Sequence, residues 1–245
     1  MTISAILNDG TYHFFSETIL PNGRKFLYEK DMAISCNTPT SISIGNIGME
    51  KINGKLPEKF DFVMSWLGGA LYPLTVRIDD MGKAKEIVNI DEVRERYAAE
   101  GQRIMEYYEQ APTIVQYIKK CIERAQDEKD VLRCIAQSNL YQLATACMDI
   151  SNSEYRLVDF PFMGDILTFC LSIEDENEAE MLLTIPEIET ERKLLSHEGK
   201  VYVHRTGKGT FDHIQLMLTV EIEDEGYYTR RLELKKAEEQ RKTNM

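Results

Sequence analysis

Residues 211–223 have the sequence FDHIQLMLTVEIE, and this stretch indicates the fold class. From Ile214 to Ile222 every second residue is apolar, and the residues between them are mostly polar. Such a period of two is typical of a strand with one buried face and one face in water, which antiparallel sheets allow. Glycine-containing turns on both sides predict neighbouring strands at 199–205 and 227–234. We therefore expect an antiparallel sheet in the last third of the chain.

The first 56 residues predict further strands. Asp9-Gly10 and Asn22-Gly23 are pairs that supply the positive φ angles of a tight hairpin turn. Gly45 and Gly48 indicate a bulge or bend inside a later strand. The strands expected here are at 3–7, 11–20, 25–35 and 40–51, with the first three joined by the two hairpins.

The middle of the chain changes to a helical period. We expect one helix over 57–71, with an apolar stripe along one side. The segment 91–150 predicts two or three more helices, and Pro112 fits the first position of one of them. Between these regions, alternating apolar and polar residues predict a hairpin with strands at 74–78 and 84–89.

We expect a single α+β domain over residues 1–245, because no Pro-, Gly- and Ser-rich linker and no internal repeat divides the chain. Its architecture would be a curved antiparallel sheet, formed by the N- and C-terminal strands and packed on a central layer of three to four helices. A split into an N-terminal α/β half and a C-terminal β half is the alternative. The expected segments are strands at 1–56, a helix and a hairpin at 57–90, helices at 91–150, strands at 155–235 that include 166–173 and 179–185, and a frayed tail at 236–245.

The chain carries 29 Lys and Arg residues against 41 Asp and Glu residues, a formal net charge of −12. This balance argues against nucleic-acid binding and against a basic membrane-binding helix. The charge is concentrated, because between Arg156 and Arg192 the sequence has ten acidic residues and no Lys or Arg. We therefore expect a surface there that binds a basic protein partner. Its candidate residues are Glu174, Asp175, Glu176 and Glu178.

Targeting signals and membrane spans are not expected. The N-terminal residues lack the basic and apolar regions of a secretory signal, and no segment approaches about 18 uninterrupted apolar residues. The five cysteines are scattered without a Cys-x-x-Cys pair, which is typical of reduced thiols. We expect a cytoplasmic protein that binds neither membranes nor nucleic acid, and its oligomeric state stays open.

No recognisable catalytic motif is present in the sequence. It has no Gly-x-Ser-x-Gly elbow and no His-Glu-x-x-His pair, and the glycines at 207–210 do not have the spacing of a phosphate-binding loop. His204 and His213 flank that turn, and whether they share a face of the sheet depends on the strand register. A third metal ligand is not apparent near them. We therefore expect no catalytic residue, no metal and no cofactor.

Aromatic residues gather in the helical region. Trp66, Tyr97 and Tyr108 lie on helices that we expect to face the sheet. Tyrosine and tryptophan suit both core edges and binding pockets, because they combine an apolar ring with a polar atom. Packing in the core is the simpler interpretation. If the sheet curves, the same three residues are candidates for lining a cavity that binds a small apolar molecule.

The run 70–83, ALYPLTVRIDDMGK, is followed by Ile87-Val88-Asn89 and by charged, tyrosine-rich helices. In this pattern, which spans 57–150, the chain resembles uncharacterised bacterial α+β proteins. In outline it is also similar to the half-barrel of periplasmic lipoprotein carriers. That likeness implies a curved antiparallel sheet wrapped around helices, with an apolar cavity between them. The chain departs from the carriers in having no signal peptide, and the likeness assigns no functional residue.

Three functions are compatible with these patterns. The first is a non-catalytic interaction module that binds a partner through the acidic C-terminal surface. The alternatives are a carrier or sensor that binds an apolar small molecule between sheet and helices, and a hydrolase without a recognisable motif. The clustered charge and the missing catalytic motifs favour the first.

Overall fold

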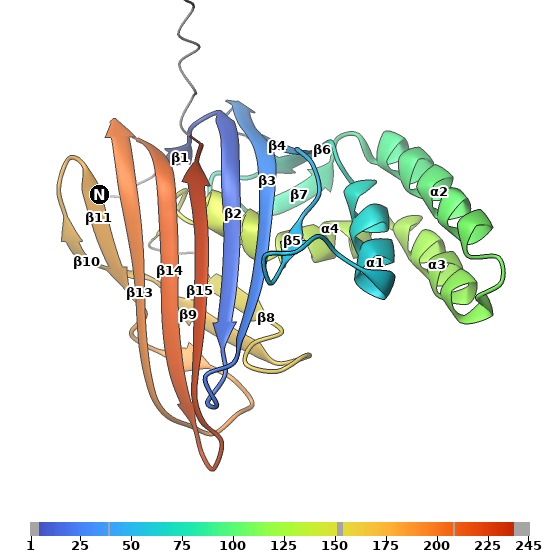
Figure 1. The fold of residues 1–245 in the computed structure, drawn as a ribbon. Coiled ribbons are helices and arrows are strands. Elements are labelled where there is room, and N and C mark those ends of the chain that lie inside the picture. The colour runs from blue at the N-terminus through green and yellow to red at the C-terminus, as the bar shows by residue number, and fades with distance from the viewer. Residues whose placement is uncertain (1–4, 39, 151–153, 208, 238–245) are drawn as a thin grey trace, which may run out of the picture.

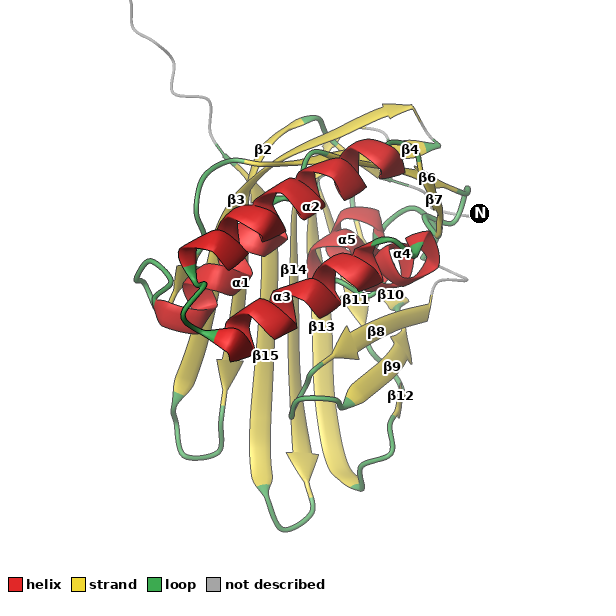
Figure 2. Cartoon of the chain, turned by 90° about the vertical axis from the view of Figure 1, so that its right-hand side faces the viewer, coloured by secondary structure: helices red, strands yellow, loops and turns green. Residues whose placement is uncertain are grey.

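A computed structural model describes residues 5–38, 40–150, 154–207 and 209–237. It confirms the expected α+β fold, in which a large curved antiparallel sheet packs against helices (Figures 1 and 2). The described residues contain five helices, more than the three to four expected. The single-domain organisation stays a prediction.

The large sheet has twelve strands. Most of them follow one another in hydrogen-bonded order, from a free edge strand, β10, to the other edge strand, β7 (Figure 1). In this order they are β10 (Ser172–Glu176), β11 (Glu180–Thr184), β13 (Leu194–Gly207), β14 (Thr210–Ile222), β15 (Gly226–Lys236), β2 (Gly10–Ile19), β3 (Lys25–Thr38), β4 (Ser41–Asn46), β6 (Leu74–Ile78) and β7 (Ala84–Ile87). Two short strands pair off this path, β1 (Ile6–Leu7) with β14 and β5 (Lys51–Ile52) with β3.

β15 and β2 join the C-terminal strands to the N-terminal strands in the middle of the sheet (Figure 1). Their antiparallel register runs from Thr229 opposite Ile19 to Lys236 opposite Tyr12. The predicted hairpin turn between β2 and β3 is confirmed, with Gly23 at a φ of 77°. The sheet is therefore formed by both ends of the chain, as the sequence predicted.

The hairpin predicted at Asp9-Gly10 is wrong. β1 does not pair with β2 but runs parallel to β14, with Ile6 opposite Thr210. The chain at Asp9 lies against β3, where Asp9 Oδ1 accepts a hydrogen bond from the backbone N–H of Cys36 at 2.6 Å. An Asp-Gly pair predicts a turn from local preference, and this long-range contact overrides it. Residues 3–4 of the expected first strand, at 3–7, lie outside the described residues.

The sequence did not predict the second, three-stranded sheet as a separate unit. The strand expected at 166–173 is divided at Leu171, which separates a strand of the small sheet from β10 of the large one. Leu167, Phe169 and Leu171 are all buried, so the period of two continues through the division and gives no sign of it. In spatial order the strands of the small sheet are β12 (Ile188–Glu189), β9 (Ile166–Cys170) and β8 (Glu154–Val158).

The helical region is divided into more pieces than expected. Ser138 causes the additional break, because its oxygen accepts a hydrogen bond from the Tyr141 N–H at 3.3 Å and its hydroxyl donates to the Ile135 carbonyl at 2.8 Å. Such a cap marks the start of a new helix. Pro112 lies in the first turn of its helix, as expected. The helices are α1 (Lys59–Gly69), α2 (Ile90–Tyr107), α3 (Pro112–Ala125), α4 (Glu128–Ala136) and α5 (Asn139–Thr145). Over the described ranges, none of these helices is long and apolar enough to cross a membrane.

The last described residues belong to the sheet rather than to the expected frayed tail at 236–245. β15 extends to Lys236, and the N–H of Ala237 donates to the carbonyl of Thr11 at 2.8 Å. Residues 238–245 lie outside the described residues.

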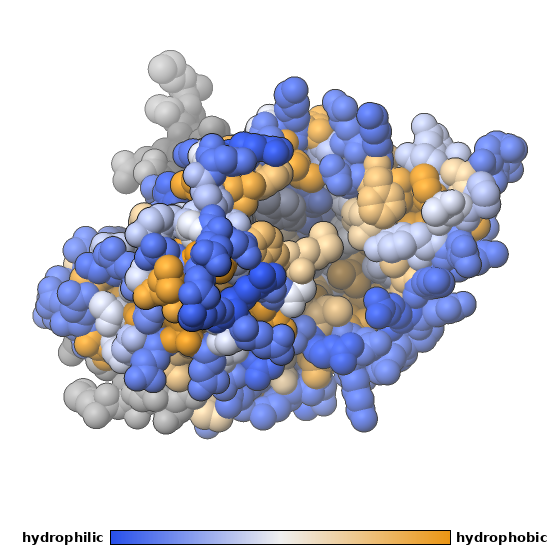
Figure 3. All heavy atoms as spheres, turned by 90° about the horizontal axis from the view of Figure 1, so that it is seen from below, coloured by the Kyte–Doolittle hydropathy of each residue, from blue (hydrophilic) through white to orange (hydrophobic). Residues whose placement is uncertain are grey.

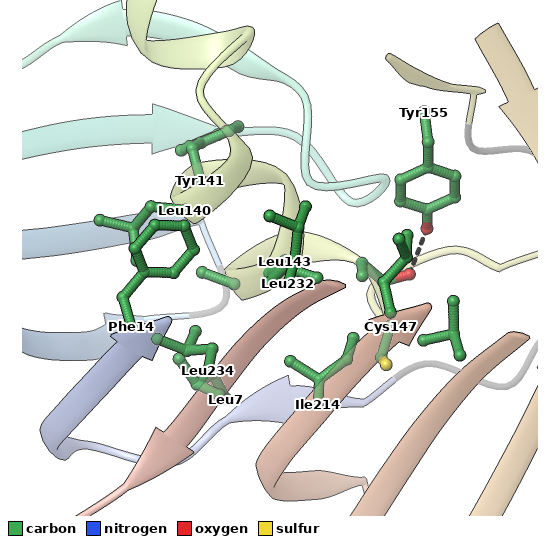
Figure 4. Packing of buried hydrophobic residues seen from close by; sticks show 14 of the residues in the cluster. Leu7, Phe14, Leu140, Tyr141, Leu143, Cys147, Tyr155, Ile214, Leu232 and Leu234 are labelled. Atoms are coloured by element: carbon green, nitrogen blue, oxygen red, sulfur yellow. Dashed lines mark hydrogen bonds between the residues drawn. The ribbon is translucent and has the colours of Figure 1, made fainter. Parts of the chain in front are cut away.

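α5 and the chain after it lie inside the curve of the large sheet (Figures 2 and 4). Nearly every residue from Leu140 to Ile150 is buried. These residues pack against the inner face of the sheet, which presents side chains such as Phe14, Ile214 and Leu232 (Figure 4). The main core of the protein therefore lies between the sheet and this short helix.

α1, α2 and α3 pack against one another beside the sheet (Figure 1). Gly101 lets α2 and α3 approach closely, because a Cβ at this position would lie 2.5 Å from the Cδ1 of Ile122. These helices have an apolar cluster of their own, separate from the main core. Its buried members are Val63, Leu67, Ile104 and Ile118.

The predicted alternation along β14 is confirmed. The inward residues from Ile214 to Ile222 are no more than 5% exposed, whereas Met217 on the outer face is 44% exposed. One face of this strand therefore contributes to the core and the other lies in water.

Leu218→Ala and Met217→Ala test this assignment, because they truncate neighbouring side chains on opposite faces of β14. We expect Leu218→Ala to lower the free energy of unfolding by about 2–5 kcal/mol, since it leaves a cavity in a packed core. Met217→Ala should change it by less than about 1 kcal/mol. Urea denaturation followed by circular dichroism measures both, and equal losses would contradict the assignment of the two faces.

Candidate functional site

The acidic residues predicted to bind a partner lie together at a free edge of the large sheet. Glu174, Asp175 and Glu176 belong to β10, where every residue is exposed, and Glu178 lies in the turn that follows. Arg205 forms an ion pair with Glu176, with 2.6 Å between Nη1 and Oε1. In the described part of the chain, Glu174, Asp175 and Glu178 form no ion pair. Their role in binding a partner stays a prediction.

The three candidate aromatic residues also lie together, but among α1, α2 and α3. Trp66, Tyr97 and Tyr108 pack on the apolar cluster of these helices. Trp66 Nε1 donates a hydrogen bond to Glu100 Oε2 at 2.9 Å, and burial raises the pKa of Tyr97. None of the three is among the residues that line the cavity described below. Their contact with a ligand stays a prediction.

His204 and His213 lie directly opposite each other in the pairing of β13 with β14. Opposite residues share a face, so the register that the sequence left open places both side chains on the outer face. Each histidine has its own carboxylate partner: His204 Nδ1 lies 2.8 Å from Asp212 Oδ1, and His213 Nε2 lies 3.0 Å from Glu233 Oε1. A search of the described residues finds no group of three or more side chains that could hold a metal ion.

The other two histidines have separate partners as well. His13 Nδ1 lies 2.8 Å from Asp31 Oδ1, and His197 Nε2 lies 3.2 Å from the carbonyl oxygen of Pro186. These contacts give the hydrolase alternative no histidine cluster among the described residues.

A cavity of about 640 Å³ lies between the inner face of the large sheet and the junction of α4 and α5. The sheet contributes side chains from β2, β3, β5 and β15, and the loop after β8 contributes Asp159. Figure 3 views the molecule from below and shows a hollow between the sheet and the helical part, with apolar side chains around it.

The cavity exists because the inner face of β2 changes along the strand. Tyr12 and Phe14 are large and buried, but the next two inward residues, Ser16 and Thr18, are small and polar. Small side chains leave space between the sheet and the helices that large ones would fill. The polar character continues on β3, where the buried residue opposite Phe14 is Lys30.

Lys30 in the cavity wall forms a buried ion pair with Glu50. The distance between Lys30 Nζ and Glu50 Oε2 is 3.2 Å, and the two side chains are 8% and 11% exposed. Tyr28 donates its hydroxyl hydrogen to the same carboxylate oxygen at 3.3 Å. Burial, together with the negative charge of Glu50, raises the pKa of Tyr72 to about 12. Because of its ion pair with Glu50, the positive charge of the Lys30 ammonium group is already neutralised within the protein.

The positive charge of Arg230, which also lines the cavity, has no ion-pair partner among the described residues. Arg230 lies on the inner face of β15 opposite Thr18, and its Nη1 donates to Thr18 Oγ1 at 2.5 Å. Its Nε is buried and has no hydrogen-bond partner. Burial lowers the pKa of Arg230 to about 10, although the nearby charge of Asp159 acts in the opposite direction. The wall of the cavity therefore contains a largely buried cation, Arg230, whose Nε has no hydrogen-bond partner among the described residues.

Asn139, the first residue of α5, adds a polar side chain to the cavity wall. Its Oδ1 is buried without a hydrogen-bond partner, and the residue lines the cavity. Buried polar atoms in proteins are normally hydrogen-bonded, so unpartnered atoms in two of the lining residues are an unusual feature of this wall. Apolar side chains, Phe14, Met32 and Leu140 among them, complete the wall. This combination suits a molecule with an apolar part and a polar part.

The sequence contained one signal of this site. Polar residues occupy the inward phase of the strands that line it: Ser16 and Thr18 in β2, Lys30 in β3 and Arg230 in β15. A polar residue at an inward position needs either a partner or an open space beside it. The sequence alone does not bring these residues together, because Thr18 and Arg230 are 212 positions apart.

No model of a known protein family matches the chain, and no curated protein matches it in sequence. The assignment of a function therefore depends on the geometry and chemistry of the cavity.

Glu50→Leu tests the buried ion pair in the wall, because it leaves the Lys30 ammonium buried without its partner. We expect it to lower the free energy of unfolding by about 3–5 kcal/mol, a typical cost of an unpaired buried charge. The double variant Lys30→Met, Glu50→Leu should recover most of this loss. Urea denaturation of both single variants and the double variant gives the coupling energy of the pair. A double variant as unstable as Glu50→Leu would contradict the coupling.

Proposed function

We propose that the protein binds an amphipathic small molecule in the cavity between the large sheet and the helices, as a carrier or a sensor. The observation that carries this proposal is a cavity of about 640 Å³ whose lining combines apolar side chains with the polar side chains of Arg230 and Asn139. Small-molecule sites typically enclose about 300–1,000 Å³ and have apolar walls with a few polar groups.

The apolar part of the wall supplies most of the expected binding energy. Each buried methylene group contributes about 0.8 kcal/mol, so an alkyl chain of about ten carbons contributes roughly 8 kcal/mol. Loss of translational and rotational freedom opposes part of this gain. Polar contacts with the Arg230 and Asn139 side chains would offset some of that loss and would fix the orientation of the molecule.

Filling the cavity tests the proposal. Ser16→Trp places a large ring on the inner face of β2, where Ser16 is 7% exposed, and Thr11→Trp places the same ring on the outer face of the same strand. We expect the wild type and Thr11→Trp to bind Nile red, an uncharged apolar dye, and Ser16→Trp to bind it at least about tenfold more weakly. Fluorescence titration measures all three. Equal affinities would place the dye outside the cavity and contradict the proposal.

Two exposed cysteines provide a second measurement in the wild type. Cys134 lines the cavity, whereas Cys170 lies on β9 away from it. Saturation with dodecanol should slow the alkylation of Cys134 by iodoacetamide and leave the rate at Cys170 unchanged. Mass spectrometry of the peptides gives both rates. Cys170 serves as the internal control for effects of dodecanol on the reagent.

A second candidate function is the binding of a basic protein partner at β10. The specific observation is that three carboxylates that form no ion pair with another described residue lie on an exposed edge strand and its turn. An explanation without a partner also exists, because charged side chains on an edge strand prevent pairing with the sheet of another molecule. The first explanation predicts that reversing these charges weakens the binding of a basic peptide, whereas the second requires no such binding.

Replacing Glu174, Asp175 and Glu178 by Lys distinguishes them and leaves the Glu176 ion pair intact. If β10 binds a basic partner, affinity for a lysine-rich peptide at low salt should fall at least about tenfold, because surface charge pairs are weak singly and add in clusters. The matched control reverses Glu95, Glu106 and Glu109, which are exposed on or beside α2. Equal losses in both triple variants would reduce the effect to net charge and contradict a specific surface.

A further inference from the structure

Arg230 gives the cavity a defined polar end. Its neighbours on the inner face of β15 are Tyr228 and Leu232. Both are buried, so the Arg230 side chain extends from the sheet between largely apolar side chains. The hydrogen bond from Nη1 to Thr18 Oγ1 fixes one corner of the group. Nε is buried without a hydrogen-bond partner among the described residues, and the part of the side chain that lines the cavity is available to a molecule in it.

The two cationic side chains of the cavity wall, Lys30 and Arg230, differ in whether a carboxylate neutralises them. Lys30 is neutralised by Glu50 at 3.2 Å. In the ranges that the structure describes, no carboxylate forms an ion pair with Arg230. Asp159 favours the charged guanidinium, but burial has the larger, opposite effect. A water molecule in the cavity would solvate the guanidinium group without balancing its charge, whereas an anionic group would do both.

We propose that the bound amphiphile carries an anionic oxygen group, a carboxylate or a phosphate ester, which pairs with the guanidinium group of Arg230. This inference rests on the proposed binding function and specifies the class of ligand. The apolar chain of the ligand contacts Phe14, Met32 and Leu140 in the same cavity. Charge-assisted hydrogen bonds are about twice as strong as neutral ones, so the head group sets the preference among ligands of equal chain length.

Three probes with the same twelve-carbon chain test the head group: dodecanoate, dodecyl phosphate and dodecanol, each below its micelle concentration. We expect the wild type to bind at least one of the two anions about tenfold more tightly than dodecanol, as measured by isothermal titration calorimetry. The tighter of the two anions then identifies the head group as a carboxylate or a phosphate ester.

Arg230→Met is the decisive variant, because it keeps a long side chain and removes the charge and the Nε donor. We expect it to lose the preference for the anion while its affinity for dodecanol changes less than about twofold. Arg231→Met is the matched control, since Arg231 is the next residue of β15 and lies on the outer face, where its Nη2 pairs with Glu233 Oε2 at 2.6 Å. This control should keep the preference. Arg230→Lys keeps the charge and should keep part of the preference.

Failure of this inference differs from failure of the proposed function. If dodecanol and both anions bind equally to the wild type, or if Arg230→Met keeps the preference, the anionic head group is contradicted while the cavity still binds amphiphiles. If no probe binds, or if Ser16→Trp binds all probes as the wild type does, the cavity function itself is contradicted. Circular dichroism of Arg230→Met and Arg230→Lys shows whether each variant is folded, and either folded variant suffices for the comparison.

Discussion

Burial of the chain from Leu140 to Ile150 is the constraint on which the rest of the structure depends. A segment that is apolar on nearly all sides needs apolar walls on nearly all sides. The large sheet supplies most of them by curving around α5, and the small sheet supplies another through β8. Polar atoms of the segment form hydrogen bonds with residues outside it. Tyr155 donates its hydroxyl hydrogen to the carbonyl of Ala146 (Figure 4), and the N–H of Ala5 donates to the carbonyl of Cys147 at 2.7 Å. The curvature of the sheet is therefore a consequence of what it encloses.

The cavity follows from a mismatch of lengths. α5 has seven residues and is about 10 Å long, whereas β14 has thirteen residues and extends about 43 Å. A sheet that curves around so short a helix encloses more space than the helix fills. The small sheet packs into part of this space, and the inner face of β2 adapts to the remainder by changing from Phe14 to Ser16 and Thr18. Polar side chains are tolerated there because they border a cavity rather than a packed core.

Sequence reasoning found the features that depend on local pattern and missed those that depend on pairing. The alternation along β14 and the turn at Gly23 are local, and both are confirmed. The division of a continuous alternating stretch at Leu171 has no local sign, and the contact of Asp9 with β3 overrides a local turn preference. A cavity between sheet and helices was among the alternatives, but the residues that line it were not predicted, for the same reason. Aromatic residues in the helices were candidates for ligand binding because of their residue type alone. The side chains that line the cavity come together only when β15 pairs with β2.

The pairing of β15 with β2 also determines when the cavity is formed during synthesis. Thr18 leaves the ribosome early, but Arg230 is 212 positions further along the chain. Until β15 emerges, β2 has a partner on one side only, and the wall of the cavity is open along its length. Closing a loop of this size has a large entropic cost, so the strands in the middle of the sheet pair late. A ligand can therefore contact Arg230 only in a chain that has been translated through β15.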